Sequence, residues 1–119
     1  MSKVDSGNYG ETLAVNYLKK LGYRILERNY RIRGGEIDIV ARDGEFLVFV
    51  EVKARWSHEY GLPVESITYW KIKALKKTAA FYCVKINWGD KPYRLDMVSI
   101  DLAKSRDKKE IELIKNITG

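Results

Sequence analysis

Residues Gly34–Arg55, GGEIDIVARDGEFLVFVEVKAR, have the pattern of a single β-hairpin. The Asp43-Gly44 pair near its centre predicts a two-residue turn, because both residues tolerate the positive φ that a type I′ turn requires. Such a turn places Arg42 opposite Glu45 and sets the register of both strands. The facing pairs further from the turn would then be Val40 with Leu47, Asp38 with Phe49, and Glu36 with Glu51.

The two faces of this hairpin differ in character. One face is apolar throughout and consists of Ile37, Ile39, Ala41, Phe46, Val48, Val50 and Val52. The other face is apolar near the turn, where it carries Val40, Leu47 and Phe49, and it gathers Glu36, Asp38, Glu51 and Lys53 at its far end. A solvated face would be polar along its whole length, so this pattern predicts a sheet covered on both sides.

The acidic end of the hairpin predicts a metal site. Carboxylates within about 4–6 Å of each other disfavour each other's ionisation unless a cation intervenes, and Lys53 supplies a single positive charge. Mg²⁺ and Mn²⁺ take oxygen ligands and are typically bound through one or two carboxylates together with substrate phosphate. We therefore expect Asp38, Glu51 and the Val52 carbonyl to hold the metal in a phosphoryl-transfer reaction. Lys53 would lie beside the attacking water or the developing charge.

The same residues resemble a nuclease signature. Asp38 followed by Glu51-x-Lys53 on the next strand looks like the PD-(D/E)xK motif, and the surrounding sequence resembles the YraN-like family of bacterial predicted endonucleases, which are similar to archaeal Holliday-junction resolvases. The likeness runs from GxxGExLAVxYLxxxGYxILxRNYR at Gly7–Arg31 to RLDMVSI at Arg94–Ile100. Short motifs of this kind occur by chance in many chains, whereas the hairpin geometry and the longer match make the resemblance specific.

The resemblance implies a metal-dependent DNA endonuclease with a restriction-endonuclease-like core. Ile37 stands where the broad signature has proline, a departure that YraN-like proteins share. The positions that match the family's site residues are Glu11, Asp38, Glu51 and Lys53, with Glu36 as a frequent companion.

Glu11 has two possible roles. It lies near the start of a helix expected over residues 9–21, where an acid can simply complement the helix dipole. It also borders the helix's apolar stripe, from which it could reach the acidic end of the hairpin as a further metal or water ligand. The resemblance favours the second role.

The remaining elements extend the hairpin into an α/β fold. We expect strands over residues 23–32, 93–101 and 111–117, and a second helix that begins between Val64 and Tyr69 and ends near residues 84–86. The order α-β-β-β-α-β-β predicts one mixed β-sheet flanked by helices. On the second helix, Ile72, Leu75, Ala79, Tyr82 and Ile86 are expected to pack on the sheet, and Trp56, Trp70 and Trp88 are interpreted as structural.

A group of lysines on the second helix is open to two interpretations. Lys73, Lys76 and Lys77 share a face, with Lys71 nearby. They form either an ordinary solvated face or a stripe that follows the phosphates of a nucleic acid.

Composition fits one small domain spanning residues 1–119. The formal net charge of +6 favours polyanionic partners. Nucleic acid, and DNA in particular, is the expected partner. No apolar run suits a membrane span, and the first residues lack a signal-peptide core, which predicts a cytoplasmic protein. Cys83 is the only cysteine, so no intrachain disulfide forms. His58, the only histidine, is expected to be a solvated loop residue.

Three functions are compatible with these patterns. The leading hypothesis is a Mg²⁺- or Mn²⁺-dependent endonuclease acting on DNA, possible substrates being branched or structured DNA. The first alternative is a nucleic-acid-binding module of the same fold with little or no cleavage. The second is a protein-interaction domain whose acidic cluster is solvated. A junction-cleaving role would further imply a homodimer, since two symmetric strands are cut.

Overall fold

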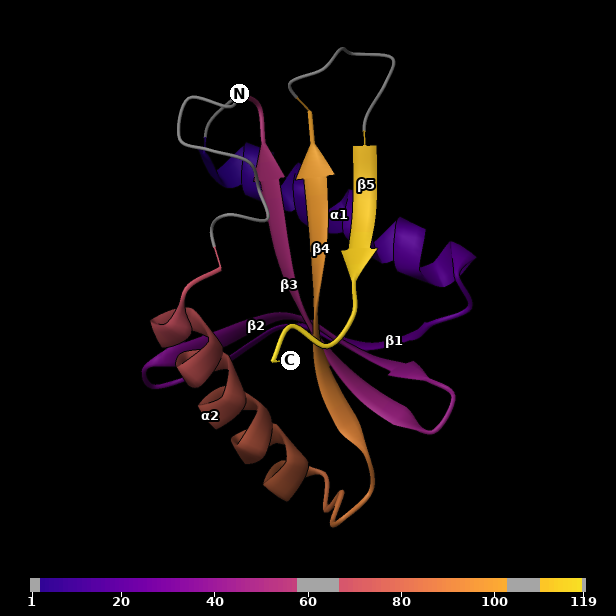
Figure 1. Ribbon diagram of the computed structural model, residues 1–119, viewed down its shortest axis with the longest axis vertical. Helices are drawn as coiled ribbons and strands as arrows, with labels where there is room; N and C mark the ends of the chain where they lie inside the picture. Colours follow the sequence, from indigo (N-terminus) through magenta and orange to yellow (C-terminus); the bar gives the residue numbers. More distant parts are fainter. Residues whose placement is uncertain (1–2, 58–66, 103–109, 119) are drawn as a thin grey trace.

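The computed structural model describes residues 3–57, 67–102 and 110–118, with side chains described from residue 8 onward. The elements are α1 (Lys3–Lys20), β1 (Arg24–Ile32), β2 (Gly35–Asp43), β3 (Phe46–Arg55), α2 (Tyr69–Lys85), β4 (Tyr93–Asp101) and β5 (Glu110–Ile114). Their order confirms the predicted mixed α/β fold, with helices flanking one sheet (Figure 1).

The five strands lie in the order β1-β2-β3-β4-β5. All neighbouring strands are antiparallel except β3 and β4, which are parallel and are joined through α2. A parallel pair needs such a crossover because its strands run the same way. β1 and β5 form the two edges of the sheet.

Two apolar clusters cover the two faces of the sheet, which confirms the prediction of a sheet buried on both sides. α1 contributes Ala14, Val15 and Leu18 to one cluster, against Ile39, Ala41, Val48, Val50, Val98 and Ile100. α2 contributes Leu75, Ala79 and Tyr82 to the other, against Ile37, Val40, Leu47, Phe49 and Leu95.

The predicted hairpin register is wrong by two residues. Asp43 pairs with Phe46 and Val40 pairs with Phe49, so Gly44 and Glu45 form the turn. Of these two turn residues only Gly44 has a positive φ. Asp43, which was expected in the turn, stays in the strand, where its carboxylate accepts a hydrogen bond from Arg94 Nη2 at 2.8 Å. A shift of two preserves the faces, since side chains alternate with period two.

Ile37 is an exception to the predicted faces. It packs with Leu75 and Tyr82 on the α2 side rather than with Ile39 on the α1 side. The β2–β3 pairing reaches only as far as Ile39 and Val50, and beyond this point the strands separate. From there to its start β2 is paired with β1 alone, so β3 no longer constrains the face on which its side chains lie, and strict alternation fails.

α2 has its predicted extent, whereas α1 begins earlier than predicted. α1 begins at Lys3, six residues before the expected start at Tyr9, because a helix once nucleated extends through residues that carry no apolar stripe. It ends at Lys20, one residue before the predicted end, and Gly22 closes the turn that follows with a φ of +93° and an N–H that donates to the Lys19 carbonyl at 3.0 Å. α2 buries Leu75, Thr78, Ala79 and Tyr82, whereas Ile72 is half-buried and Ile86 is exposed, contrary to prediction.

The tryptophans have different environments. Trp88 is buried, as predicted, and its Nε1–H donates to the Pro92 carbonyl at 3.2 Å. Trp56 is half-exposed and stacks on Tyr9 with ring centroids 6.0 Å apart. Trp70 is 72% exposed, so its interpretation as a structural residue is wrong. His58 lies outside the described residues.

Neither helix, over the part of the chain that the structure describes, combines the length and the apolar character needed to cross a bilayer.

Candidate active site

An acidic pocket opens where β2 and β3 separate, beneath the first turns of α2. Its volume is about 290 Å³. The lining residues come from three elements: Glu36 and Asp38 from β2, Glu51 from β3, and Lys71, Ala74 and Leu75 from α2. The structure therefore brings together three of the acids that the sequence placed at the far end of the hairpin.

Asp38 is fixed in this pocket by the backbone of β3. Because the β2–β3 ladder ends at Ile39 and Val50, the next inward N–H of β3, that of Val52, donates to Asp38 Oδ2 at 2.8 Å. The contact holds the carboxylate in one orientation and leaves Oδ1 for another partner. The structure thus shows Val52 acting through its N–H, whereas the predicted contribution was its carbonyl.

The electrostatic state of Asp38 is unusual for a carboxyl group. Burial raises its pKa to about 7, with Glu51 as the next largest cause and with smaller contributions from Glu36 and Glu11, against the lowering effect of the Val52 N–H. Carboxylates that repel one another in a partly buried pocket favour binding of a cation, because the cation restores the charged form. A raised pKa in a cleft is also a common mark of a functional site.

Lys71 supplies the positive charge that the pocket already contains. Its Nζ lies 2.7 Å from Glu51 Oε1, and only 10% of the Glu51 side chain is exposed. Lys71 is placed by the start of α2, where its backbone N–H donates to the Thr68 side-chain oxygen at 3.1 Å. Of the four lysines proposed to follow phosphates, Lys71 enters the pocket, whereas Lys73, Lys76 and Lys77 are exposed on α2.

Lys53 lies close to the pocket but does not line it. Burial lowers its pKa, and the neighbouring Lys71 and Arg55 lower it further, while Glu51 and Asp38 oppose the change. These contributions place the ammonium among two other cations and the two central acids. Arg55 adds a buried Nε that has no hydrogen-bond partner among the described residues.

Glu11 is buried beside the pocket but points toward β1. Its Oε1 accepts hydrogen bonds from Arg28 Nε at 2.9 Å and from Asn29 Nδ2 at 3.1 Å. Its charge still contributes to the raised pKa of Asp38. In this conformation Glu11 is a supporting acid with partners of its own, and it does not reach into the pocket.

Asn29 is a site residue that the sequence argument overlooked. Its neighbours Arg28 and Tyr30 pair with Ile39 and Ile37, so Asn29 stands across from Asp38. Its φ of +55° is rare in the middle of a strand, and its side chain anchors Glu11. The available signal was an asparagine within a run of strand-forming residues, because asparagine is depleted in strands and enriched at positive φ.

Glu36 occupies the outer edge of the pocket. It is exposed, and its Oε1 lies 3.3 Å from Arg31 Nε across the β1–β2 ladder. It adds negative charge near Asp38 without being fixed by a buried partner.

The donor set can be tested against a divalent cation. Among residues 3–57, 67–102 and 110–118, no three Asp, Glu, His or Cys side chains converge as a preformed metal cluster. Asp38 and Glu51 nevertheless share one pocket and repel each other, and two carboxylates with water and phosphate oxygens are enough for Mg²⁺ or Mn²⁺. The residues therefore fit such an ion, provided that Lys71 yields its place on Glu51.

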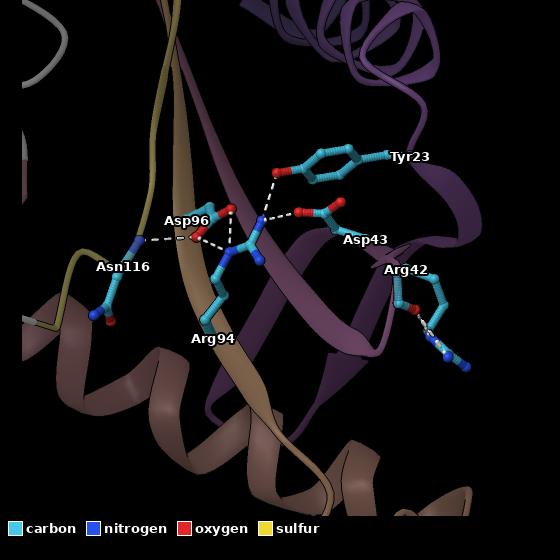
Figure 2. A network of polar contacts seen from close by, with 7 residues as sticks. Tyr23, Arg42, Asp43, Arg94, Asp96 and Asn116 are labelled. Atoms are coloured by element: carbon cyan, nitrogen blue, oxygen red, sulfur yellow. Dashed lines mark hydrogen bonds and ion pairs between the residues drawn. The ribbon is translucent and has the colours of Figure 1, made fainter.

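A separate polar network lies on the α1 face of the sheet (Figure 2). Arg94 Nε donates to both oxygens of Asp96 at 3.0 and 3.1 Å, which makes an ion pair within β4. Arg94 Nη2 also donates to Asp43 and to the Tyr23 hydroxyl, while the Asn116 N–H donates to Asp96 at 2.9 Å. Asp96 therefore belongs to this network and not to the acidic pocket on the α2 face.

Comparison with known proteins identifies relatives over nearly the whole chain. The profile of a family described as "Uncharacterised protein family UPF0102" matches residues 10–100. A UPF0102 protein of Clostridium botulinum is 47% identical over 113 residues, covering 94% of this chain and 92% of the relative. A UPF0102 protein of Caldicellulosiruptor saccharolyticus is 43% identical over 116 residues, covering 98% of each chain.

Proposed function

The chain belongs to the UPF0102 family, whose description names no reaction, and we propose that it is a metal-dependent endonuclease that hydrolyses phosphodiester bonds in DNA. The observation that carries this proposal is the meeting of Asp38 and Glu51 in one pocket, with Lys71 inside it and Lys53 beside it. A pocket of opposed acids bordered by cations suits phosphate, because phosphate is negative and must be brought close to carboxylates.

The topology supports the same proposal. The acids lie on the second and third strands, at the point where these strands separate, and Glu51 and Lys53 are two residues apart on the central β3. This arrangement resembles the restriction-endonuclease-like core, in which the PD-(D/E)xK signature occupies two adjacent strands. The sequence resemblance and the observed topology therefore both favour assignment to the PD-(D/E)xK nucleases.

Asp38 and Glu51 would hold Mg²⁺ or Mn²⁺ in the proposed site. When bound, the ion supplies a water of lowered pKa and charge stabilisation at the phosphate oxygens. The Val52 N–H keeps Asp38 oriented with Oδ1 available. Glu11 and Glu36 increase the negative potential, which strengthens the attraction for a cation.

The cations have complementary roles in this proposal. Lys53 orients the attacking water or stabilises the negative charge that grows on the phosphate, and its lowered pKa eases proton exchange at Nζ. Lys71, whose Nζ contacts Glu51 in this structure, would be available to bind a nonbridging phosphate oxygen if Glu51 held a divalent cation. Both lysines lie close enough to the acids to interact with them electrostatically: Lys71 pairs with Glu51, and Glu51 and Asp38 both act on the pKa of Lys53.

The Glu51–Lys71 ion pair also favours a second candidate function. A lysine that neutralises one of the two central acids makes a stable site without any metal. In that case the chain is a nucleic-acid-binding module that cleaves DNA slowly or not at all.

A cleavage assay separates the two candidates. Labelled single-stranded, duplex, flap and four-way-junction DNA are incubated with Mg²⁺, Mn²⁺ or EDTA, using the wild type, Lys53→Ala and Lys20→Ala. Lys20 is an exposed lysine in the last turn of α1 and is the matched control. We expect metal-dependent cleavage that Lys53→Ala abolishes and Lys20→Ala retains. Absence of cleavage, or equal cleavage by Lys53→Ala, would refute the nuclease assignment, and binding without cleavage would favour the second candidate.

A further inference from the structure

Two aromatic side chains are largely exposed to solvent at the start of α2. Tyr69 is 68% exposed and Trp70 is 72% exposed. Their rings contact each other edge to face, with centroids 5.2 Å apart, and Lys73 Nζ lies 5.7 Å from the centre of the Trp70 ring. Neither ring belongs to the core clusters on the two sides of the sheet. Packing of the hydrophobic core in the described residues therefore does not explain why two aromatic side chains stand at this position.

This aromatic pair adjoins the acidic pocket. Lys71, the residue immediately after Trp70, reaches Glu51 inside the pocket. Ala74 and Leu75, one turn further along α2, also line it. A polynucleotide with one phosphate in the pocket would thus bring a neighbouring base within reach of the rings.

The charge around the pair identifies the kind of ligand. Every charged residue of α2 is a lysine, and its first turn contains no acid. Protein interfaces are depleted of lysine at their centres, whereas sites for single-stranded nucleic acid combine exposed aromatic rings with cations that contact the backbone. Tyr69, Trp70, Lys73, Lys76 and Lys77 match the second description.

We propose that Tyr69 and Trp70 form a stacking platform for an unpaired nucleobase beside the acidic pocket, so that the substrate class is DNA with unpaired nucleotides. The bases of an intact duplex are stacked on one another and offer no free face, whereas single strands, flaps and opened branches do. The part of this inference that concerns cleavage rests on the proposed nuclease function, and the part that concerns base binding stands on the platform itself.

Binding measurements in Ca²⁺ test the platform without requiring turnover. A short labelled oligothymidine and a blunt duplex of equal length are titrated with the wild type, Trp70→Ala, Trp70→Phe and Phe81→Ala. Phe81 is the matched control, because it is an exposed aromatic on the same helix, 54% exposed, and lies about 16 Å further along the axis.

Loss of the indole should act on unpaired DNA selectively. We expect Trp70→Ala to weaken oligothymidine binding roughly ten- to a hundredfold, while duplex affinity changes by no more than about twofold. Trp70→Phe should retain most of the affinity because it keeps an aromatic face, and Phe81→Ala should resemble the wild type. Binding by the wild type should also quench tryptophan fluorescence, with a smaller change in Trp70→Phe.

The outcomes separate this inference from the nuclease assignment. Metal-dependent cleavage with equal oligothymidine binding by the wild type and Trp70→Ala would overturn the platform and leave the nuclease standing. Selective loss of binding in Trp70→Ala without cleavage of any substrate would support the platform and refute the nuclease. Failure of the wild type to bind oligothymidine would overturn the platform. A change of oligomeric state in Trp70→Ala by light scattering, with unchanged DNA binding, would also overturn it and would identify the pair as a contact between protein chains.

Discussion

At the scale of single residues, Asp38 is the group whose environment departs most from that of an ordinary carboxylate. Its pKa is raised from the ordinary value of 3.8 to about 7, chiefly by burial and then by Glu51. The raised value means that the folded protein binds a proton at Asp38 more tightly than the unfolded chain does. Proton binding at Asp38 therefore stabilises the folded protein. This stabilisation is fully present below about pH 4 and is lost as the pH rises through about 7.

Asp38→Asn should therefore stabilise the metal-free protein at pH 8. Asparagine removes the repelled charge and can still accept the hydrogen bond from the Val52 N–H. We expect a gain on the order of 1 kcal/mol, or several degrees in Tm, that shrinks toward pH 5. Thermal melts in EDTA between pH 5 and pH 8.5 measure the difference, with the exposed Glu45→Gln as control. If Tm varied with pH in the same way for the wild type and Asp38→Asn, the pKa of Asp38 would not be raised by burial and by its acidic neighbours.

On the α1 face of the sheet, Arg94 is the residue whose polar contacts are expected to contribute most to stability. Only 12% of its side chain is exposed, and Asp96, its main partner, is fully buried (Figure 2). Arg94→Met should lower the free energy of unfolding by about 3 kcal/mol, because Asp96 would lose its guanidinium partner in a buried position. Arg94→Lys should lose less, since it keeps the charge but lacks the planar fork. Urea unfolding at pH 7 measures both, and a loss below about 1 kcal/mol for Arg94→Met would contradict the role given to this network.

At the scale of elements, the close approach of α2 to β2 sets the shape of the acidic pocket. A Cβ added at Gly35 would lie 2.0 Å from Thr78 Oγ1 and 3.3 Å from Thr78 Cβ. Thr78 is itself buried, and its hydroxyl donates to the Ala74 carbonyl at 2.8 Å, so it cannot easily move away. Glycine at position 35 therefore lets the helix come near enough for Lys71 to reach Glu51.

Gly35→Ala should push α2 outward and destabilise the fold by about 1–3 kcal/mol. The Gly35→Ala, Thr78→Ala double variant should recover part of the loss, because the closest clashing atom is removed. Denaturant unfolding of the four members of this cycle gives the coupling free energy. Strictly additive effects would show that α2 does not pack against Gly35 as described.

The sequence predicted the elements well because each has a strong local cause. The hairpin follows from Gly44 between two apolar strands, although the turn is Gly44-Glu45 and not the predicted Asp43-Gly44, and the end of α1 follows from Gly22. The alternation of the strands placed Asp38 and Glu51 on one face even though the register was shifted by two residues. Parity survives such a shift, so the predicted site did not depend on the turn type.

The features that the sequence did not predict depend on contacts between distant elements. Asp43 stays in β2 because Arg94 of β4 binds it, and Ile37 turns to the α2 side because β2 and β3 separate there. The position of Lys71 on Glu51 depends on how α2 crosses the sheet, which no local pattern reveals. Trp70 was interpreted as structural on residue type alone, and its exposure depends on how α2 lies on the sheet.

At the scale of the whole molecule, charge is divided between an acidic pocket and a basic helix beside it. The net charge of +6 favours approach of a polyanion, while Glu36, Asp38 and Glu51 concentrate negative charge in one place. Lys71 of α2 lines that pocket, and in the proposed function the exposed lysines of the same helix would offer a favourable path for a phosphate backbone. In the proposed endonuclease, a bound divalent cation would link the acidic pocket to the phosphate.

Equilibrium binding of Mn²⁺ without nucleic acid is the most direct test of this account. The electron paramagnetic resonance signal of free Mn²⁺ is followed as the ion is titrated into the wild type, Asp38→Asn, Lys71→Met and Glu45→Gln. We predict saturable binding that Asp38→Asn abolishes, that Glu45→Gln leaves unchanged, and that Lys71→Met strengthens because Glu51 loses its competing ammonium. Absence of saturable binding in the wild type, or equal binding by Asp38→Asn, would contradict a metal centre in the acidic pocket.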